Sequence, residues 1–85
     1  MEFAKNEGYI ITDKIHIGND EFVLGVHESQ PNMFVTWKYN PKEDNYYWGH
    51  YHSDLYKAQK DLVNRAAAAA RMRDSLVREE ARQCH

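Results

Sequence analysis

Two histidines separated by one residue are the clearest candidates for chemistry in this chain. His50 and His52 lie in an aromatic run typical of a strand, where side chains two residues apart share one face. Such a pair supplies two of the four ligands of a zinc site, and His16, His27 or a second subunit would complete it. We favour the simpler interpretation, in which both histidines are partly exposed and Asp54 belongs to the start of a helix.

The His-x-His-x-Asp spacing here resembles that of zinc hydrolases of the metallo-β-lactamase type. Leu55 stands where that motif has its next histidine, and 85 residues is far shorter than such an enzyme needs. Nucleophilic catalysis has no better candidate, because Cys84 and His85 are adjacent at the chain end and nothing holds them in register with a base. We therefore predict no enzyme activity, no metal site and no cofactor.

Four strand patterns precede Ser53. They cover residues 9–17, 21–27, 33–39 and 46–52, and turn-forming Gly, Pro, Asn and Asp residues separate them. Gly18 and Asn19 between the first two runs indicate a tight hairpin. Because short connections make sequential strands neighbours, we predict a four-stranded antiparallel meander in the order 1-2-3-4.

The chain changes character at Ser53, because the 32 residues from Asp54 to His85 contain no Gly and no Pro. Apolar residues recur at three- and four-residue spacing, which predicts one helix over 53–83 with Ser53 as its N-cap. We expect a single domain over 1–85, an α+β fold with the sheet at 8–52 and the helix packed on one face. The predicted core consists of Ile11, Ile15, Ile17, Phe22, Leu24, Val26, Val35, Trp37, Leu55, Leu62 and Ala66.

The predicted helix is longer than the sheet that supports it. It would run ~45 Å at 1.5 Å per residue, whereas a seven-residue strand is only ~23 Å long. The distal half is therefore expected to need a partner, and the alanines at 66–70 would let a second helix approach closely. We predict a homodimer whose self-association residues are Ala69, Met72, Leu76 and Val77.

Charge is unevenly distributed along the chain, whose formal net charge is −2. Residues 1–54 carry four basic and nine acidic side chains, a balance of −5, and residues 55–85 carry seven basic and four acidic, a balance of +3. The single cysteine, Cys84, excludes an internal disulfide and indicates a reducing compartment. No apolar run approaches the ~18 residues that span a bilayer, so we expect a cytoplasmic protein that does not contact membranes.

Tyrosines and tryptophans crowd the third and fourth predicted strands, and such residues are enriched at interface hot spots. A single helix covers one sheet face, so we expect several of these rings on an open face beside acidic residues. The helix also carries five arginines, among them Arg65, Arg71 and Arg73, which would track phosphates. A small accessory protein that binds nucleic acid through this helix is therefore the alternative function.

The aromatic spacing of Val35-Thr36-Trp37 and of the segment 46–51, followed by an acidic helix start, resembles small proteins carried on mobile elements of Gram-positive bacteria. The likeness covers roughly residues 9–66. Many such proteins inhibit host defence stoichiometrically, anti-CRISPR proteins among them, which implies a protein-binding inhibitor of a CRISPR effector nuclease in the host cytoplasm. The partner-binding residues are predicted from the sequence itself and not from this resemblance, because carboxylates would mimic phosphate charge in a positive groove while Tyr and Trp side chains anchor the contact. They are Asp13, Asp20, Glu21, Glu43, Asp44, Tyr46 and Trp48.

Overall fold

The computed structural model describes residues 4–83, and it describes side chains as far as Arg73. Five strands precede one helix. The elements are β1 (Lys5–Asn6), β2 (Tyr9–Ile17), β3 (Asp20–His27), β4 (Phe34–Asn40), β5 (Asn45–His52) and α1 (Leu55–Gln83).

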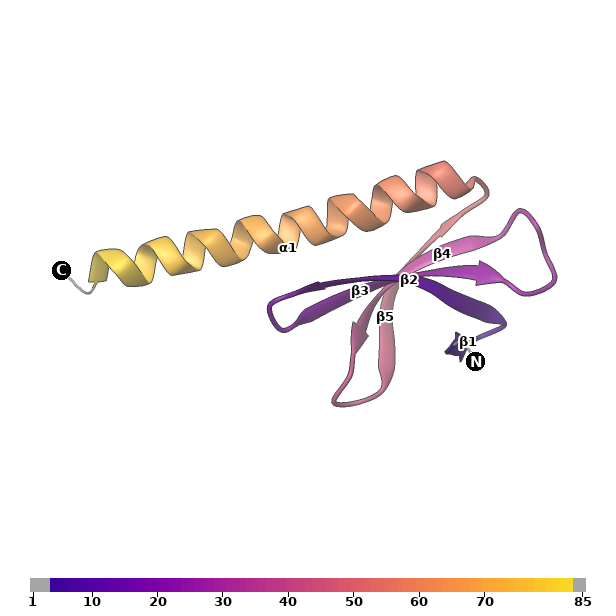
Figure 1. The fold of residues 1–85 in the computed structure, drawn as a ribbon, viewed down its shortest axis with the longest axis horizontal. Helices are drawn as coiled ribbons and strands as arrows, with labels where there is room; N and C mark the ends of the chain where they lie inside the picture. Colours follow the sequence, from indigo (N-terminus) through magenta and orange to yellow (C-terminus); the bar gives the residue numbers. More distant parts are fainter. Residues whose placement is uncertain (1–3, 84–85) are drawn as a thin grey trace.

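The strands form one antiparallel sheet in the order β1-β2-β3-β4-β5, which curls into a half-barrel with α1 against it (Figure 1). The four predicted strands and their order are confirmed, but the sheet has a fifth strand. β1 pairs Lys5 with Ile10 and Asn6 with Tyr9 across a tight turn. Glu7 and Gly8 in this turn both have positive φ, at 50° and 85°. Two residues are too few to show a strand period, so the sequence gives no signal for β1.

The helix begins at Leu55, two residues after the predicted start at 53, and its N-cap is one residue later than predicted. The Lys57 amide donates to Asp54 Oδ2 at 3.2 Å, and the Ala58 amide donates to the Asp54 carbonyl at 3.1 Å. Asp54 is therefore the N-cap, and the assignment of this role to Ser53 was wrong. The carboxylate also lies at the positive end of the helix dipole, which favours a negative charge there.

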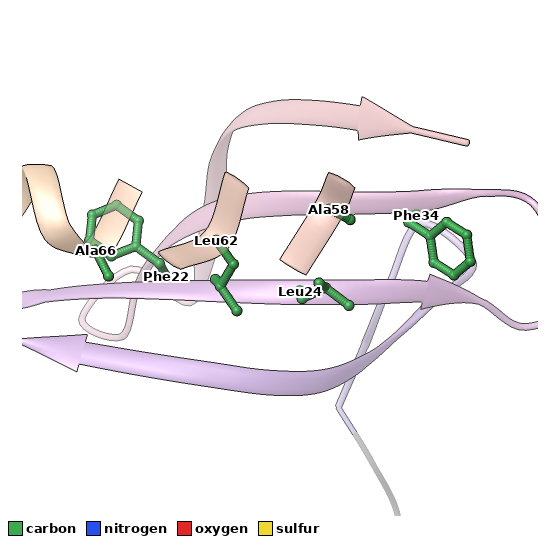
Figure 2. Close-up of a cluster of buried hydrophobic side chains, with 6 residues drawn as sticks. All are labelled: Phe22, Leu24, Phe34, Ala58, Leu62 and Ala66. Atoms are coloured by element: carbon green, nitrogen blue, oxygen red, sulfur yellow. The ribbon is translucent and has the colours of Figure 1, made fainter. Parts of the chain in front are cut away.

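A first core lies between the sheet and α1. Figure 2 shows Ala58, Leu62 and Ala66 of the helix facing side chains of β3 and β4. Ile15, Ile17, Val26 and Ala69 pack at its margin and stay half-buried. Leu55, predicted as core, is 40% exposed, because the helix starts at this residue and its first turn lies at the margin of the sheet. The buried members of this core are Phe22, Leu24, Phe34, Ala58, Leu62 and Ala66.

A second core lies on the opposite face of the sheet, which is not the open face that the sequence predicted. Val35 and Trp37 are buried as expected, but they point away from the helix because they alternate with Phe34 and Thr36. Ile11 joins them because a β-bulge lets it pair with Gly25 while Asp13 pairs with Leu24. The cluster consists of Tyr9, Ile11, Val23, Val35 and Trp37, with Tyr39 and Tyr46 packed against it.

The helix extends past the sheet. The molecule is 56 Å long and only 26 by 22 Å in cross-section, and Figure 1 shows α1 continuing beyond the β2–β3 turn. Arg73 lies at this turn, where a Cβ on Gly18 would collide with its guanidinium. The ten helical residues that follow continue for about 15 Å at 1.5 Å per residue.

Candidate binding surface

Four of the predicted partner-binding residues gather at one end of the sheet. The β2–β3 turn and the β4–β5 loop are neighbours there, since Glu21 pairs with Tyr39 and Asn40 pairs with Asn45. We call this end of the sheet the acidic tip and define it by Asp20, Glu21, Glu43 and Asp44. Asp13 does not belong to it, because Asp13 lies at the bulge in the middle of β2 and accepts a hydrogen bond from Thr12.

Two tyrosines hold the carboxylates of the β4–β5 loop. The Tyr39 hydroxyl donates to Asp44 Oδ1 at 2.7 Å, and the Tyr47 hydroxyl donates to Glu43 Oε2. The bond to Asp44 raises the pKa of Tyr39 to about 12, and the bond to Glu43 raises the pKa of Tyr47. Both phenols are therefore protonated donors at neutral pH, and the two carboxylates are held as acceptors.

The two predicted aromatic anchors lie on opposite sides of the sheet. Tyr46 packs into the second core, with its ring centroid 5.3 Å from that of Trp37 and 4.8 Å from that of Tyr39. Partial burial raises its pKa. Trp48 lies on the helix side, is 69% exposed, and has the Lys38 Nζ 5.3 Å from its ring centroid.

A second β-bulge explains the position of Trp48. Thr36 pairs with His50 and Lys38 pairs with Tyr47, so Trp37 faces two residues of β5, Trp48 and Gly49. Trp48 takes a left-handed backbone conformation, with φ of 52°. Such a conformation is rare for a bulky side chain and tends to occur at functional positions.

Two hollows of the molecular surface have Trp48 in their lining. The first, of about 640 Å³, lies between the two hairpin ends, and Lys42, Glu43 and Tyr47 line it. The second, of about 460 Å³, lies between the sheet and the middle of α1, and we call it the helix–sheet groove. Asp20, Lys38 and Trp48 line both, and Lys38 Nζ is 3.1 Å from Asp20 Oδ1.

A polar cluster that the sequence did not reveal connects α1 to the sheet. Asp61 Oδ2 accepts a hydrogen bond from Thr36 Oγ1 at 2.6 Å and lies 2.9 Å from His50 Nδ1 and 3.2 Å from His52 Nε2. Arg65 Nη1 donates to the carbonyl and hydroxyl oxygens of Thr36, at 3.1 and 3.0 Å. The sequence gives a single indication of this cluster. Asp61 lies on the same face of the predicted helix as the apolar residues Ala58 and Leu62.

The environment of this cluster shifts two pKa values. Partial burial by itself would raise the pKa of Asp61, but hydrogen bonds from Thr36 and the two histidines outweigh it and lower the pKa. Burial lowers the pKa of Arg65, and the Asp61 charge opposes this. The two histidines thus lie on one strand face as predicted, but they converge on a helix carboxylate. Among the residues that the structure describes, no group of three or more His, Cys, Asp or Glu side chains is arranged to hold a metal ion.

The residues predicted for self-association have different environments. Met72 is 69% exposed, whereas Ala69 packs against the first core. Ala66 is buried in that core, so part of the alanine run at 66–70 serves the packing of α1 on the sheet. Leu76 and Val77 lie outside the side chains that the structure describes.

Comparison with protein-family models, with curated proteins and with solved structures found no match to this chain. Within the described part of the chain, α1 is not apolar enough over any stretch of sufficient length to cross a membrane.

Proposed function

We propose that this chain is a non-enzymatic protein-binding inhibitor that docks onto its partner through the acidic tip. The observation that supports this most directly is the pair of tyrosine-held carboxylates, Glu43 and Asp44. Carboxylates held in place lose less conformational freedom on binding than free side chains do, so more of their interaction energy contributes to affinity.

The charge distribution defines the kind of partner surface. The segment 1–54 carries a balance of −5, and four of its carboxylates stand at the ends of two adjacent hairpins. A surface of this sign steers association toward a basic partner and raises the association rate at low salt. The partner should therefore present a positive groove or patch.

A CRISPR effector nuclease is the partner we propose, which makes the chain an anti-CRISPR protein acting in the host cytoplasm. Such nucleases hold nucleic acid in a positively charged channel. The carboxylates of the acidic tip would occupy phosphate positions in that channel and block DNA binding or cleavage. The resemblance of its aromatic spacing to that of mobile-element proteins supports this choice.

We propose in addition that the chain forms a homodimer through α1 from Met72 onward. Met72 supports this, because a large apolar side chain that is 69% exposed gains from being covered. Leu76 and Val77 follow at helical spacing in the sequence. A particle mass near 20 kDa by light scattering, reduced to the 10.1 kDa of one chain by Met72→Glu, is expected. A single-chain mass for the wild type at micromolar concentration would contradict the dimer.

The test of the main proposal compares two double variants with equal changes in charge. Glu43→Gln with Asp44→Asn alters the acidic tip, whereas Glu7→Gln with Glu28→Gln alters residues near the β1–β2 turn, at the other end of the sheet. The wild type is expected to capture the effector nuclease from a host lysate and to protect a plasmid from CRISPR interference. The acidic-tip variant should lose both effects and the control variant should keep them.

Two results would contradict the proposal. One is a wild-type chain that captures no CRISPR component and gives no protection. The other is an equal loss in both double variants, which would show a dependence on total charge and not on the acidic tip.

A further inference from the structure

Cationic and apolar side chains together line the helix–sheet groove. Phe22 and Met72 contribute apolar surface, and the guanidinium carbon of Arg65 lies 5.9 Å from the Phe22 ring centroid. Three cations, Lys38, Arg65 and Arg73, line the groove against one carboxylate, Asp20. The lining therefore has a local balance of +2, in a chain whose overall charge is −2.

Trp48 gives the groove an exposed aromatic wall. Trp48 is 69% exposed, its ring centroid lies 6.2 Å from that of Tyr47, and the β5 bulge with its positive φ directs it outward. The Lys38 ammonium group interacts with this ring. An exposed indole beside cations is the combination with which proteins bind unpaired bases, since every base has a face that stacks and a phosphate that needs a counter-charge.

We infer that the helix–sheet groove binds single-stranded nucleic acid, with a base stacked on Trp48 and phosphates contacted by Lys38, Arg65 and Arg73. Planar guanidinium groups match phosphate oxygens in geometry as well as in charge. Arg65 and Arg73 are eight residues apart, about 12 Å along the helix axis, so their contacts suit a chain of several nucleotides better than one nucleotide.

This site differs from an arginine stripe along the whole helix. Arg65 is oriented by its bonds to Thr36, and Asp61 offsets part of its charge from behind. Arg73 lies against the β2–β3 turn. Arg71 is exposed and does not line the groove, so it provides a control within the same helix.

Tryptophan fluorescence provides a direct test, because Trp37 is 3% exposed and Trp48 is 69% exposed. We expect an oligothymidylate of about twelve nucleotides to quench the Trp48 emission at low salt. In anisotropy measurements with a labelled oligonucleotide, Trp48→Ala should weaken binding about tenfold or more, from the loss of base stacking. Tyr56→Ala, which removes a ring of the same 69% exposure at the helix start, should leave affinity unchanged.

Salt dependence tests the phosphate contacts. With three cations, the slope of log K against log salt should be about −2, at about −0.7 for each phosphate contact of a single strand. Arg73→Gln should make the slope shallower by about 0.7, and Arg71→Gln should not change it.

Three outcomes would overturn the inference. The first is an absence of quenching by the oligonucleotide at low salt. The second is an equal loss of oligonucleotide affinity in Trp48→Ala and Tyr56→Ala. The third is that a polyglutamate with the same charge as the oligonucleotide quenches the emission equally strongly. The last result would assign the groove to an acidic peptide. The Glu43→Gln with Asp44→Asn variant should keep oligonucleotide binding, so this inference and the proposed inhibitor function fail or survive separately.

Discussion

Replacement of Thr36 by Val is the sharpest test of how the helix is held on the sheet. Thr36 is fully buried, with no exposed surface, and its hydroxyl donates to Asp61 at 2.6 Å while accepting from Arg65 at 3.0 Å. Val has nearly the same shape, so the change removes the hydroxyl without leaving a cavity. Asp61 keeps its two histidine neighbours, and Arg65 keeps the Thr36 carbonyl.

The expected loss follows from these contacts. A hydrogen bond to a charged group contributes about 1.5–3 kcal/mol, and part of the loss is offset because a buried methyl group is more apolar than a hydroxyl. We expect the free energy of unfolding to fall by about 1.5 kcal/mol. For a domain of this size, that lowers the melting temperature by roughly 6–12 °C.

Urea and thermal unfolding followed by circular dichroism would measure this difference at neutral pH. Thr12→Val is the matched control, because it removes the same group from an exposed hydrogen bond, that between Thr12 and Asp13. The control should change stability by no more than about 0.5 kcal/mol. If Thr36→Val is as stable as the wild type, the hydrogen bonds of Thr36 to Asp61 and Arg65 do not stabilise the packing of the helix.

Three further predictions concern pH and packing. Because the pKa of Asp61 is lowered from its usual 3.8, its ionised form stabilises the fold above that pH. The stability difference between the wild type and Asp61→Asn in urea unfolding should be present at neutral pH and vanish as pH falls below 3.8. A difference that does not depend on pH would contradict this. The pKa of Tyr39 is raised to about 12 from a usual 10.0, so its protonated form stabilises the fold below pH 10 and this contribution is lost as pH rises toward 12. In the Asp44→Asn variant, the tyrosinate absorbance of Tyr39 should develop closer to pH 10. An unchanged titration would contradict the hydrogen bond between Tyr39 and Asp44. Gly25→Ala should lower the urea midpoint by an amount equivalent to about 1–3 kcal/mol. The reason is that a Cβ there would lie 2.9 Å from the Tyr9 Cβ and 3.3 Å from Trp37 Cζ3. A neutral effect would show that the second core is loosely packed.

Local sequence patterns are sufficient to specify most of the secondary-structure elements. The two-residue period of Phe22, Leu24 and Val26, the turn at Gly18 and the uninterrupted helical stretch after Asp54 are properties of neighbouring residues, and four strands and the helix were predicted within one or two residues. The helix residues Leu62 and Ala66 were placed in the core for the same reason, since a 3.6-residue period identifies the buried face without knowledge of its partner.

The faces that these elements share depend on how the strands and the helix pack together. A bulge at Thr12 shifts the alternation of β2 by one residue, so Ile11 joins Trp37 on the face away from the helix. A bulge opposite Trp37 shifts the alternation of β5 in the same way, so Trp48 turns outward. No local pattern specifies such a shift, because it depends on how two strands pair. The convergence of Asp61 on Thr36 arises in the same way, across 25 residues of sequence, and a contact at that separation exists only once the helix has docked on the curled sheet.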